Sequence, residues 1–317
     1  MGKYFPFFFL LFPAICCAGI LQERGFREAL TPSPSFRQSE GEVKWDKQPE
    51  SELDLGKAYY YGRGTKKNFK KARKHLQKAA DAGEREAQLI LALMQVQGQG
   101  IAKNPQAGFE AVQKLAPDYP LAQYALARLY ADGLGTPANA EKALKWLTRA
   151  AQAPVPVPAA QVQLGNYYAE GYPPYIKPDA EKAFELTLAA AEAENRTARY
   201  RVALMYLNGQ GTEKNEKRAF HFMRLSARDG LIQAQKALSD MYRNGTGVAQ
   251  DDYGVFSWML AAAKNGDAEA QEQTALHYLH GTGVAASRKE ALFWAVRAQQ
   301  NGGKNAAEII RRIKEDQ

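Results

Sequence analysis

The chain has 317 residues, of which 45% are hydrophobic and 24% charged, and it carries a formal net charge of +8 with a pI near 9.2. The excess of positive charge permits a negatively charged partner, such as an acidic polysaccharide, an anionic lipid or a nucleic acid. The only cysteines are Cys16 and Cys17, which excludes disulfides, thiolate nucleophiles and cysteine-ligated metals from the rest of the chain.

Residues 1–18 have the pattern of a secretory signal peptide. Lys3 supplies a basic start, residues 4–15 form an apolar stretch, and Ala18 offers a small residue for cleavage. The stretch is short for a membrane span, although a retained anchor is an alternative interpretation. A lipoprotein signal fits poorly, because Ile15 and Cys16 precede the two cysteines. We expect export to the periplasm, with secretion or a secretory lumen as alternatives, and no membrane span after signal removal.

Residues 19–50 differ from everything that follows. They mix charges with Pro32, Pro34 and Pro49 and show no sustained apolar period. This composition predicts a flexible linker, so the folded part of the chain is expected to begin at residue 51.

A glycine then recurs at a nearly fixed interval. The recurring glycines are Gly62, Gly98, Gly133, Gly171, Gly209, Gly245 and Gly281, with spacings of 36, 35, 38, 38, 36 and 36 residues. A period in this range indicates a solenoid, in which each repeat buries its apolar face only against its neighbours. We therefore expect one elongated domain over residues 51–306, although the length alone would suggest two.

The repeat is clearest over residues 122–153. Ala122, Leu126, Leu129 and Tyr130 recur at helical spacing, which predicts a first helix with one apolar face. The glycines that follow end this helix, because glycine readily adopts the positive φ angles of a tight turn. A second helix then carries its small and apolar residues in one stripe: Ala143, Trp146, Leu147, Ala150 and Ala151.

The same frame predicts seven helix–turn–helix repeats. Their expected bounds are 51–86, 87–121, 122–159, 160–197, 198–233, 234–269 and 270–306. The second repeat is degenerate, because Gln95 replaces the usual tyrosine and Pro117 and Pro120 interrupt its end. Residues 307–317 are predicted to form a capping helix and tail that cover the last apolar face.

The frame A-x3-L-[GA]-x2-Y-x2-G-x-G-[TV], followed by A-x2-W-x3-A-A-x2-G, resembles the Sel-1-like repeat family, a relative of the tetratricopeptide repeats. The resemblance implies an all-α fold, a right-handed α/α superhelical solenoid that serves mostly as an adaptor or scaffold. Exported bacterial members resemble assembly factors for exopolysaccharide export, envelope and motility complexes, or host interaction. Some secreted relatives have a disulfide in each repeat and are linked to β-lactam hydrolysis, which fits poorly here because these repeats lack cysteine.

The sequence contains no recognisable motif for a nucleotide or a metal ion. The Gly-x-Gly turns follow a helix and recur in each repeat, so we interpret them as structural turns and not as nucleotide-binding loops. His277 and His280 are three residues apart but lack an acidic or cysteine partner. His75 and His221 occupy ordinary repeat positions. We expect no cofactor and no metal site.

The sequence contains no recognisable set of catalytic residues either. Ser226 replaces a repeat alanine, which indicates packing rather than a nucleophile. Asp251, Asp252, Glu213 and Glu216 lie in or near turns between helices, where carboxylates commonly cap helix starts. We expect that the protein is not an enzyme, with a secreted hydrolase of the β-lactamase-like or peptidoglycan-processing kind as the alternative.

One charged run and two proline-rich segments stand out from the rest of the array. A basic run is most simply a solvated helix face and alternatively a polyanion site: Lys66, Lys67, Lys70, Lys71, Arg73 and Lys74. The proline-rich loop 172–178 replaces the usual turn and carries Tyr172 and Tyr175 as contact candidates, with a structural kink as an equal alternative. The proline-alternating segment 153–159 could bend the array between the third and fourth repeats.

The expected partner-binding surface is the concave face of the solenoid. By analogy with tetratricopeptide grooves, first-helix side chains outside the apolar stripe should line it, and tyrosine and arginine suit such contacts. These candidates are Lys57, Tyr60, Tyr61, Tyr124, Arg128, Asn166, Tyr200, Lys236, Asp240, Arg243 and His280.

We therefore expect a non-catalytic exported scaffold or adaptor that mediates protein–protein interactions in a cell-envelope assembly. Its partners are expected to be proteins, with peptidoglycan or an anionic polysaccharide as further candidates and no specific nucleic acid. A secreted factor that binds host proteins or glycans is the remaining alternative.

Overall fold

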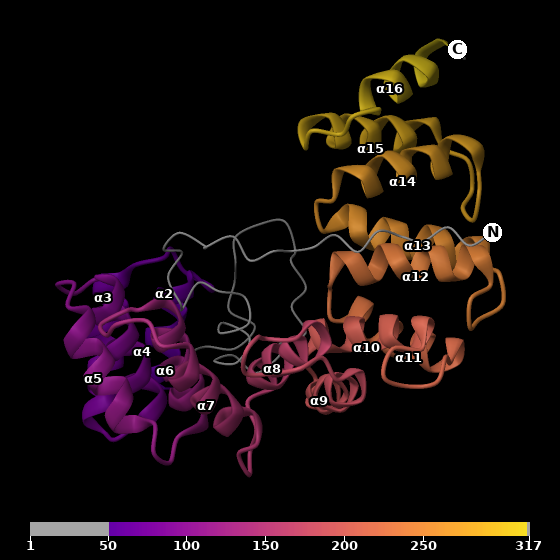
Figure 1. Cartoon of the computed structure of the whole chain (residues 1–317). Coiled ribbons are helices and arrows are strands. Elements are labelled where there is room, and N and C mark those ends of the chain that lie inside the picture. Colours follow the sequence, from indigo (N-terminus) through magenta and orange to yellow (C-terminus); the bar gives the residue numbers. More distant parts are fainter. Residues whose placement is uncertain (1–50, 316–317) are drawn as a thin grey trace. The chain divides into compact units, whose positions relative to one another are not determined.

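The computed structural model describes residues 51–315 (Figure 1). The predicted signal peptide (1–18) and linker (19–50) lie outside the described residues, as do residues 316–317. Every named element in the described range is an α-helix, apart from one isolated bridge between Tyr172 and Ile176. None of these helices combines the length and the apolar character needed to cross a membrane.

The described helices form seven pairs and a final single helix, as the sequence predicts. The pairs are α2 (Glu52–Tyr61) and α3 (Phe69–Asp81), α4 (Arg85–Gln97) and α5 (Pro105–Leu115), α6 (Pro120–Asp132) and α7 (Ala140–Ala151), α8 (Pro158–Glu170) and α9 (Ala180–Glu192), α10 (Arg196–Asn208) and α11 (Glu216–Arg228), α12 (Ile232–Asn244) and α13 (Asp252–Lys264), and α14 (Ala268–His280) and α15 (Arg288–Gln300). The final helix is α16 (Ala306–Glu315). The fold is an all-α solenoid of repeats.

Helix contacts divide the described chain into two compact blocks, whereas regular spacing alone predicts a single elongated domain. The N-terminal block comprises residues 51–155 and the C-terminal block residues 156–315. The division falls between α7 and α8, where Pro154 and Pro156 cannot donate a backbone hydrogen bond. Within each block, helices that follow one another in the chain pack side by side (Figure 1).

Local sequence determines where each repeat turns. Gly133 closes α6 in the left-handed conformation, with φ 66° and ψ 35°. The side chain of Asn139 then accepts a hydrogen bond from the backbone N–H of Lys142 at 2.8 Å, which satisfies a free donor at the start of α7. The second helix of each pair begins at a polar capping residue whose side chain accepts a hydrogen bond from a backbone N–H of the first turn. These capping residues are Asn68, Asn104, Asn139, Asp179, Asn215, Asp251 and Ser287.

Aromatic pairs join successive repeats. In the C-terminal block, the ring of Phe184 in α9 meets that of Tyr206 in α10 edge-to-face, with the centroids 5.2 Å apart. Phe256 in α13 and Tyr278 in α14 repeat this arrangement at 5.1 Å. Such pairs contribute about 0.5–1.5 kcal/mol beyond the burial of their area. The alanines that recur with the repeat are fully buried, which lets the helices approach closely: Ala198, Ala234 and Ala270.

A buried glutamine forms a second link between repeats. Gln235 in α12 donates from Nε2 to the carbonyl oxygen of Ala227 in α11 at 3.1 Å. Its Oε1 accepts a hydrogen bond from Nδ2 of Asn265, which follows α13, at 3.0 Å. Gln271 makes the equivalent bonds to Ala263 and Asn301, both at 3.0 Å. One side chain therefore holds three helices together.

We expect Gln235→Leu to lower the free energy of unfolding of the C-terminal block by about 1–3 kcal/mol, because it removes two hydrogen bonds that link α12 to Ala227 and Asn265, each worth roughly 0.5–1.5 kcal/mol. Urea denaturation followed by circular dichroism measures the change. Gln233→Leu is the control, since Gln233 is exposed on the same helix. Equal effects of the two substitutions would contradict the role assigned to Gln235.

The last helix covers the end of the C-terminal block. Ile309 and Ile313 of α16 are buried in the same apolar cluster as Trp294. The outer side of α16 carries Glu308, whose pKa is lowered to about 2 by hydrogen bonds from Arg311 and Arg312. The helix is therefore apolar inside and charged outside, as a terminal cap requires, and it begins at Ala306, one residue before the predicted start.

Candidate functional site

Two of the predicted partner-binding residues are not on the surface. The exposed fractions of Tyr60 and Tyr124 are 0% and 4%, and the Tyr60 hydroxyl donates a hydrogen bond to Oε1 of Gln99. Counted back from the turn glycine, Val96 of the second repeat occupies the same position as Tyr60, and Leu89 occupies the same position as Tyr124. Both Val96 and Leu89 are buried. Both tyrosines are therefore excluded from the predicted surface.

The remaining candidates of the N-terminal block are only partly exposed. Lys57 pairs with Glu86 of the next repeat at 2.6 Å. Arg128 lies 3.7 Å from Asp132 within α6. The ring of Tyr61 packs edge-to-face on the buried ring of Tyr60, with the centroids 4.9 Å apart. The contacts named here lie within the block, and the binding of a partner by these residues stays a prediction.

In the C-terminal block, polar side chains occupy the first helices α8, α10, α12 and α14. We call these residues the first-helix face: Asn166, Tyr200, Arg201, Lys236, Asp240, Arg243 and His280. Arg201 is an addition that sequence analysis missed; it donates a hydrogen bond to Oδ1 of Asn166. Burial lowers the pKa of Arg201, with Glu170 acting in the opposite direction.

Charges on this face are arranged in pairs and not in one cluster. Lys236 is hydrogen-bonded to Glu269 and lies 3.6 Å from Asp267. Burial opposes the charged form of Lys236, but these two carboxylates outweigh it, so that its pKa is raised. Asp240 accepts a hydrogen bond from Arg243. Burial also raises the pKa of Tyr200, whose ring is half-buried.

The loop of the fourth repeat forms a ladder of tyrosines. Tyr172 is stacked between Tyr167 and Tyr175, with centroids 4.4 and 5.8 Å apart and interplanar angles of 16° and 28°. The backbone N–H of Tyr172 donates to the carbonyl oxygen of Ile176 at 2.8 Å, and Ile176 is buried. Tyr175 is 44% exposed. Sequence analysis found Tyr172 and Tyr175 because the loop breaks the repeat, but it missed Tyr167, which belongs to a regular helix.

The residues weighed for chemistry have structural contacts. The hydroxyl of Ser226 is fully buried and donates to the carbonyl oxygen of Arg196 at 2.7 Å. Nδ1 of His75 lies 2.7 Å from Glu52, and Nδ1 of His277 lies 2.8 Å from the carbonyl oxygen of Thr282. Across residues 51–315, no three histidine, cysteine or acidic side chains are grouped so that they could hold a metal ion.

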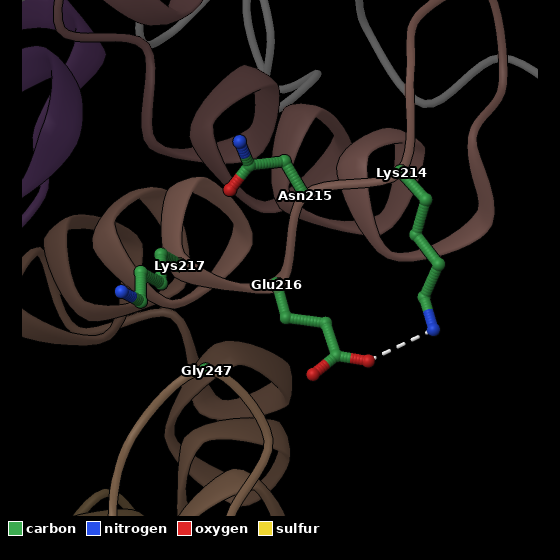
Figure 2. Close-up of a pocket in the computed structure, with 5 residues that line it drawn as sticks. All are labelled: Lys214, Asn215, Glu216, Lys217 and Gly247. Carbon is green, nitrogen blue, oxygen red and sulfur yellow. Dashed lines mark ion pairs between the residues drawn. The ribbon is translucent and has the colours of Figure 1, made fainter.

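A shallow hollow of about 450 Å³ lies at the start of α11 (Figure 2). It is lined by Lys214, Asn215, Glu216, Lys217 and Gly247. Lys214 and Glu216 are paired across it at 2.8 Å, and Asn215 is the residue that caps α11. Lys214, Glu216 and Asn215 are thus engaged in local structure.

The Sel1 repeat pattern matches this chain in seven segments. The segments are residues 49–84, 85–110, 120–154, 158–195, 197–231, 232–267 and 268–302. Together they cover more than half of the chain, and each overlaps one helix pair of the structure.

Two solved structures have the same fold. One is c5321 of uropathogenic Escherichia coli, described as a protective antigen with an SLR fold, with a TM-score of 0.65 and 26% identity over 84% of this chain and 56% of that one. The other is a Sel1 repeat protein from Oxalobacter formigenes, with a TM-score of 0.61 and 26% identity over 78% of this chain and 99% of that one.

Curated relatives match over a shorter stretch. The alginate biosynthesis protein AlgK of Pseudomonas syringae is 33% identical over 111 residues, which is 35% of this chain and 23% of AlgK. Activator of C kinase protein 1 of Saccharomyces cerevisiae is 33% identical over 109 residues, 33% of this chain and 18% of that protein. The matched stretch is therefore less than a quarter of either relative. Seven matched segments, seven helix pairs and these structural neighbours establish the family: the chain belongs to the Sel1 repeat proteins.

Proposed function

We propose that the protein is a non-catalytic, exported scaffold that holds protein partners together in a cell-envelope assembly. The observation that carries this proposal is the first-helix face of the C-terminal block. Its helices use their alanine and leucine positions for the core, and the intervening positions present charged, amide and tyrosine side chains on four successive repeats.

The chemistry of this face suits a protein partner. Asp240, Arg243 and His280 are exposed, and they combine both signs of charge with hydrogen-bonding capacity. Tyr200 adds a half-buried ring, whose rigid area loses little conformational entropy on binding. Arginine and tyrosine are the residues that most often dominate binding energy at interfaces. The tyrosine ladder of the neighbouring loop supplies a second, preorganised contact surface in the same block.

The descriptions of two similar proteins support the cellular location that we propose. The E. coli neighbour is described as a protective antigen, and AlgK is named for the biosynthesis of alginate. A bacterial envelope fits both descriptions, and it agrees with the signal peptide predicted for residues 1–18. Host- or glycan-directed secretion is the alternative that shares this export step.

The test is a crosslinking pulldown of the full-length protein from its native envelope, with mass spectrometry of the partners and of the mature N-terminus. The test variant combines Asp240→Ala, Arg243→Ala and His280→Ala. We expect it to recover the partners at least about tenfold less well, since loss of interface anchors typically costs more than 1 kcal/mol each.

A matched control combines Glu185→Ala, Lys264→Ala and Lys289→Ala, three exposed positions on the second helices α9, α13 and α15. This variant should recover the same partners as the wild type. Partner sets that are identical for both variants would contradict the assigned surface. Turnover of β-lactam or cell-wall fragments by the purified protein would overturn the non-catalytic proposal.

A further inference from the structure

The first repeat presents a helix whose exposed side is rich in lysine. We call the following residues the basic face: Lys66, Lys67, Lys70, Lys71, Arg73, Lys74 and Lys78. They lie on α3 and on the turn that precedes it, and all seven are exposed. The opposite side of α3 buries Ala72, Leu76 and Ala79 against the core, so the orientation of the helix is determined by packing.

The basic face has little counter-charge. Lys78 pairs with Glu52 at 2.8 Å, whereas Lys66, Lys70, Arg73 and Lys74 have no acidic partner within residues 51–315. Some lysines of later repeats are paired by contrast: Lys182, Lys214 and Lys236 each lie within 4.0 Å of a carboxylate.

This arrangement weakens the helix that carries it. Lys70 and Lys74, and likewise Lys74 and Lys78, are four residues apart within α3, a spacing that places like charges next to each other on a helix. Each such pair destabilises a helix by about 0.2–0.5 kcal/mol. A bound polyanion would remove this repulsion, because its charges would lie between the ammonium groups.

We propose that the basic face binds a linear acidic polysaccharide, with the carboxylates of successive sugars lying along α3. Cations four residues apart are spaced about 6 Å along the helix axis, so the helical stretch from residue 70 to residue 78 extends about 12 Å. A polymer with regularly repeated charges meets several lysines at once in this geometry. The inference rests on the proposed export of the protein, since such polymers lie outside the cytoplasm.

Other polyanions fit the basic face less well. None of the exposed large apolar side chains of the described residues lies on α3, so the face has nothing to insert into a lipid bilayer and no open ring on which bases could stack. Two of the lysines, Lys67 and Lys71, instead lie over the rings of Phe69 and Tyr59. Arg73 is the single arginine among the seven cations, whereas phosphate recognition favours the bidentate guanidinium.

The experiment measures binding of the purified protein to polygalacturonate by isothermal titration calorimetry, at about 50 and 200 mM NaCl. The test variant combines Lys66→Gln, Lys70→Gln, Arg73→Gln and Lys74→Gln. We expect its affinity to be at least about tenfold lower at the lower salt concentration, with a shallower dependence on salt, because fewer counterions are released.

The control variant removes four positive charges at scattered, exposed positions of the C-terminal block: Lys177→Gln, Lys217→Gln, Lys264→Gln and Lys289→Gln. Its affinity should stay within about twofold of the wild type, because none of these four residues belongs to the basic face. Equal losses in the two variants, or wild-type affinity in the test variant, would overturn the assigned site.

Two further probes test the chemical class of the ligand. Vesicles of phosphatidylcholine containing phosphatidylglycerol, or a single-stranded oligothymidylate, should bind more weakly than polygalacturonate. If either binds as tightly, the polysaccharide assignment is wrong. This outcome is separate from the scaffold proposal, which depends on α12 and α14 and on partner capture, so that each proposal can fail by itself.

Discussion

Replacing Gly247 by alanine is expected to lower the free energy of unfolding of the C-terminal block by about 2–4 kcal/mol. Gly247 is the second glycine of its turn, with φ +69°, a left-handed conformation that costs other residues energy. A methyl group at this position would overlap the carbonyl oxygen of Glu216, in the preceding repeat. Figure 2 shows the turn at Gly247 beside the start of the helix that carries Glu216.

The second glycine of other turns in each block also lies close to the backbone of the preceding repeat. This close packing is therefore a general feature of the contact between repeats. A methyl group would meet the backbone of the preceding second helix at four other turns: Gly100, Gly135, Gly211 and Gly283. The substitution should therefore act mainly on the coupling between repeats, and unfolding of an array need not stay two-state.

Hydrogen exchange resolves this effect by helix, and urea denaturation gives its overall size. We expect amide protection to fall in α11, α12 and α13. Gly266→Ala is the matched control, because Gly266 has φ +91° but no atom within 4 Å of the added methyl group. That variant should lose about 1 kcal/mol from backbone strain alone. A loss as large as that of Gly247→Ala would show that packing between repeats contributes nothing at this turn.

Glu272→Ala is expected to release α16 from the end of the array. Glu272 is 3% exposed, and its carboxylate accepts hydrogen bonds from the backbone N–H of Asn305 at 2.6 Å and from Asn305 Nδ2 at 3.2 Å. Asn305 directly precedes α16, so the carboxylate holds the start of the capping helix. Because the substitution removes both hydrogen bonds together with the buried carboxylate that accepts them, we expect the free energy of unfolding to fall by about 2–3 kcal/mol.

The expected consequence is local and measurable by two methods. Amides of α16 should lose protection against hydrogen exchange, and the uncovered cluster around Trp294 and Ile309 should promote self-association in sedimentation experiments. Glu269→Ala is the control, since the Glu269 side chain is 68% exposed on the same helix. Its effect should stay within about 0.5 kcal/mol. Unchanged protection of α16 in Glu272→Ala would contradict the anchoring role.

The candidate surface was predictable only in part, and particular residues show why. Asp240, Arg243 and His280 are exposed, as expected for polar residues outside an apolar stripe. Tyr60 and Tyr124 are buried, because their exposure depends on which side chains the neighbouring repeat places opposite them. The sequence predicted only part of the tyrosine ladder. The irregular loop revealed Tyr172 and Tyr175, but only folding stacks Tyr167 on Tyr172.

The sequence by itself determined that the chain folds into helix pairs, and how many of them there are. Helical spacing of apolar residues, left-handed glycines and capping residues such as Asn139 act over a few residues, and such local preferences can be read from the chain. Tertiary structure alone decided the division into two blocks, the bonds of Gln235, the anchor at Glu272 and the burial of Tyr60. These features join residues of different helices, and the energy of such contacts depends on positions that only the packed chain defines.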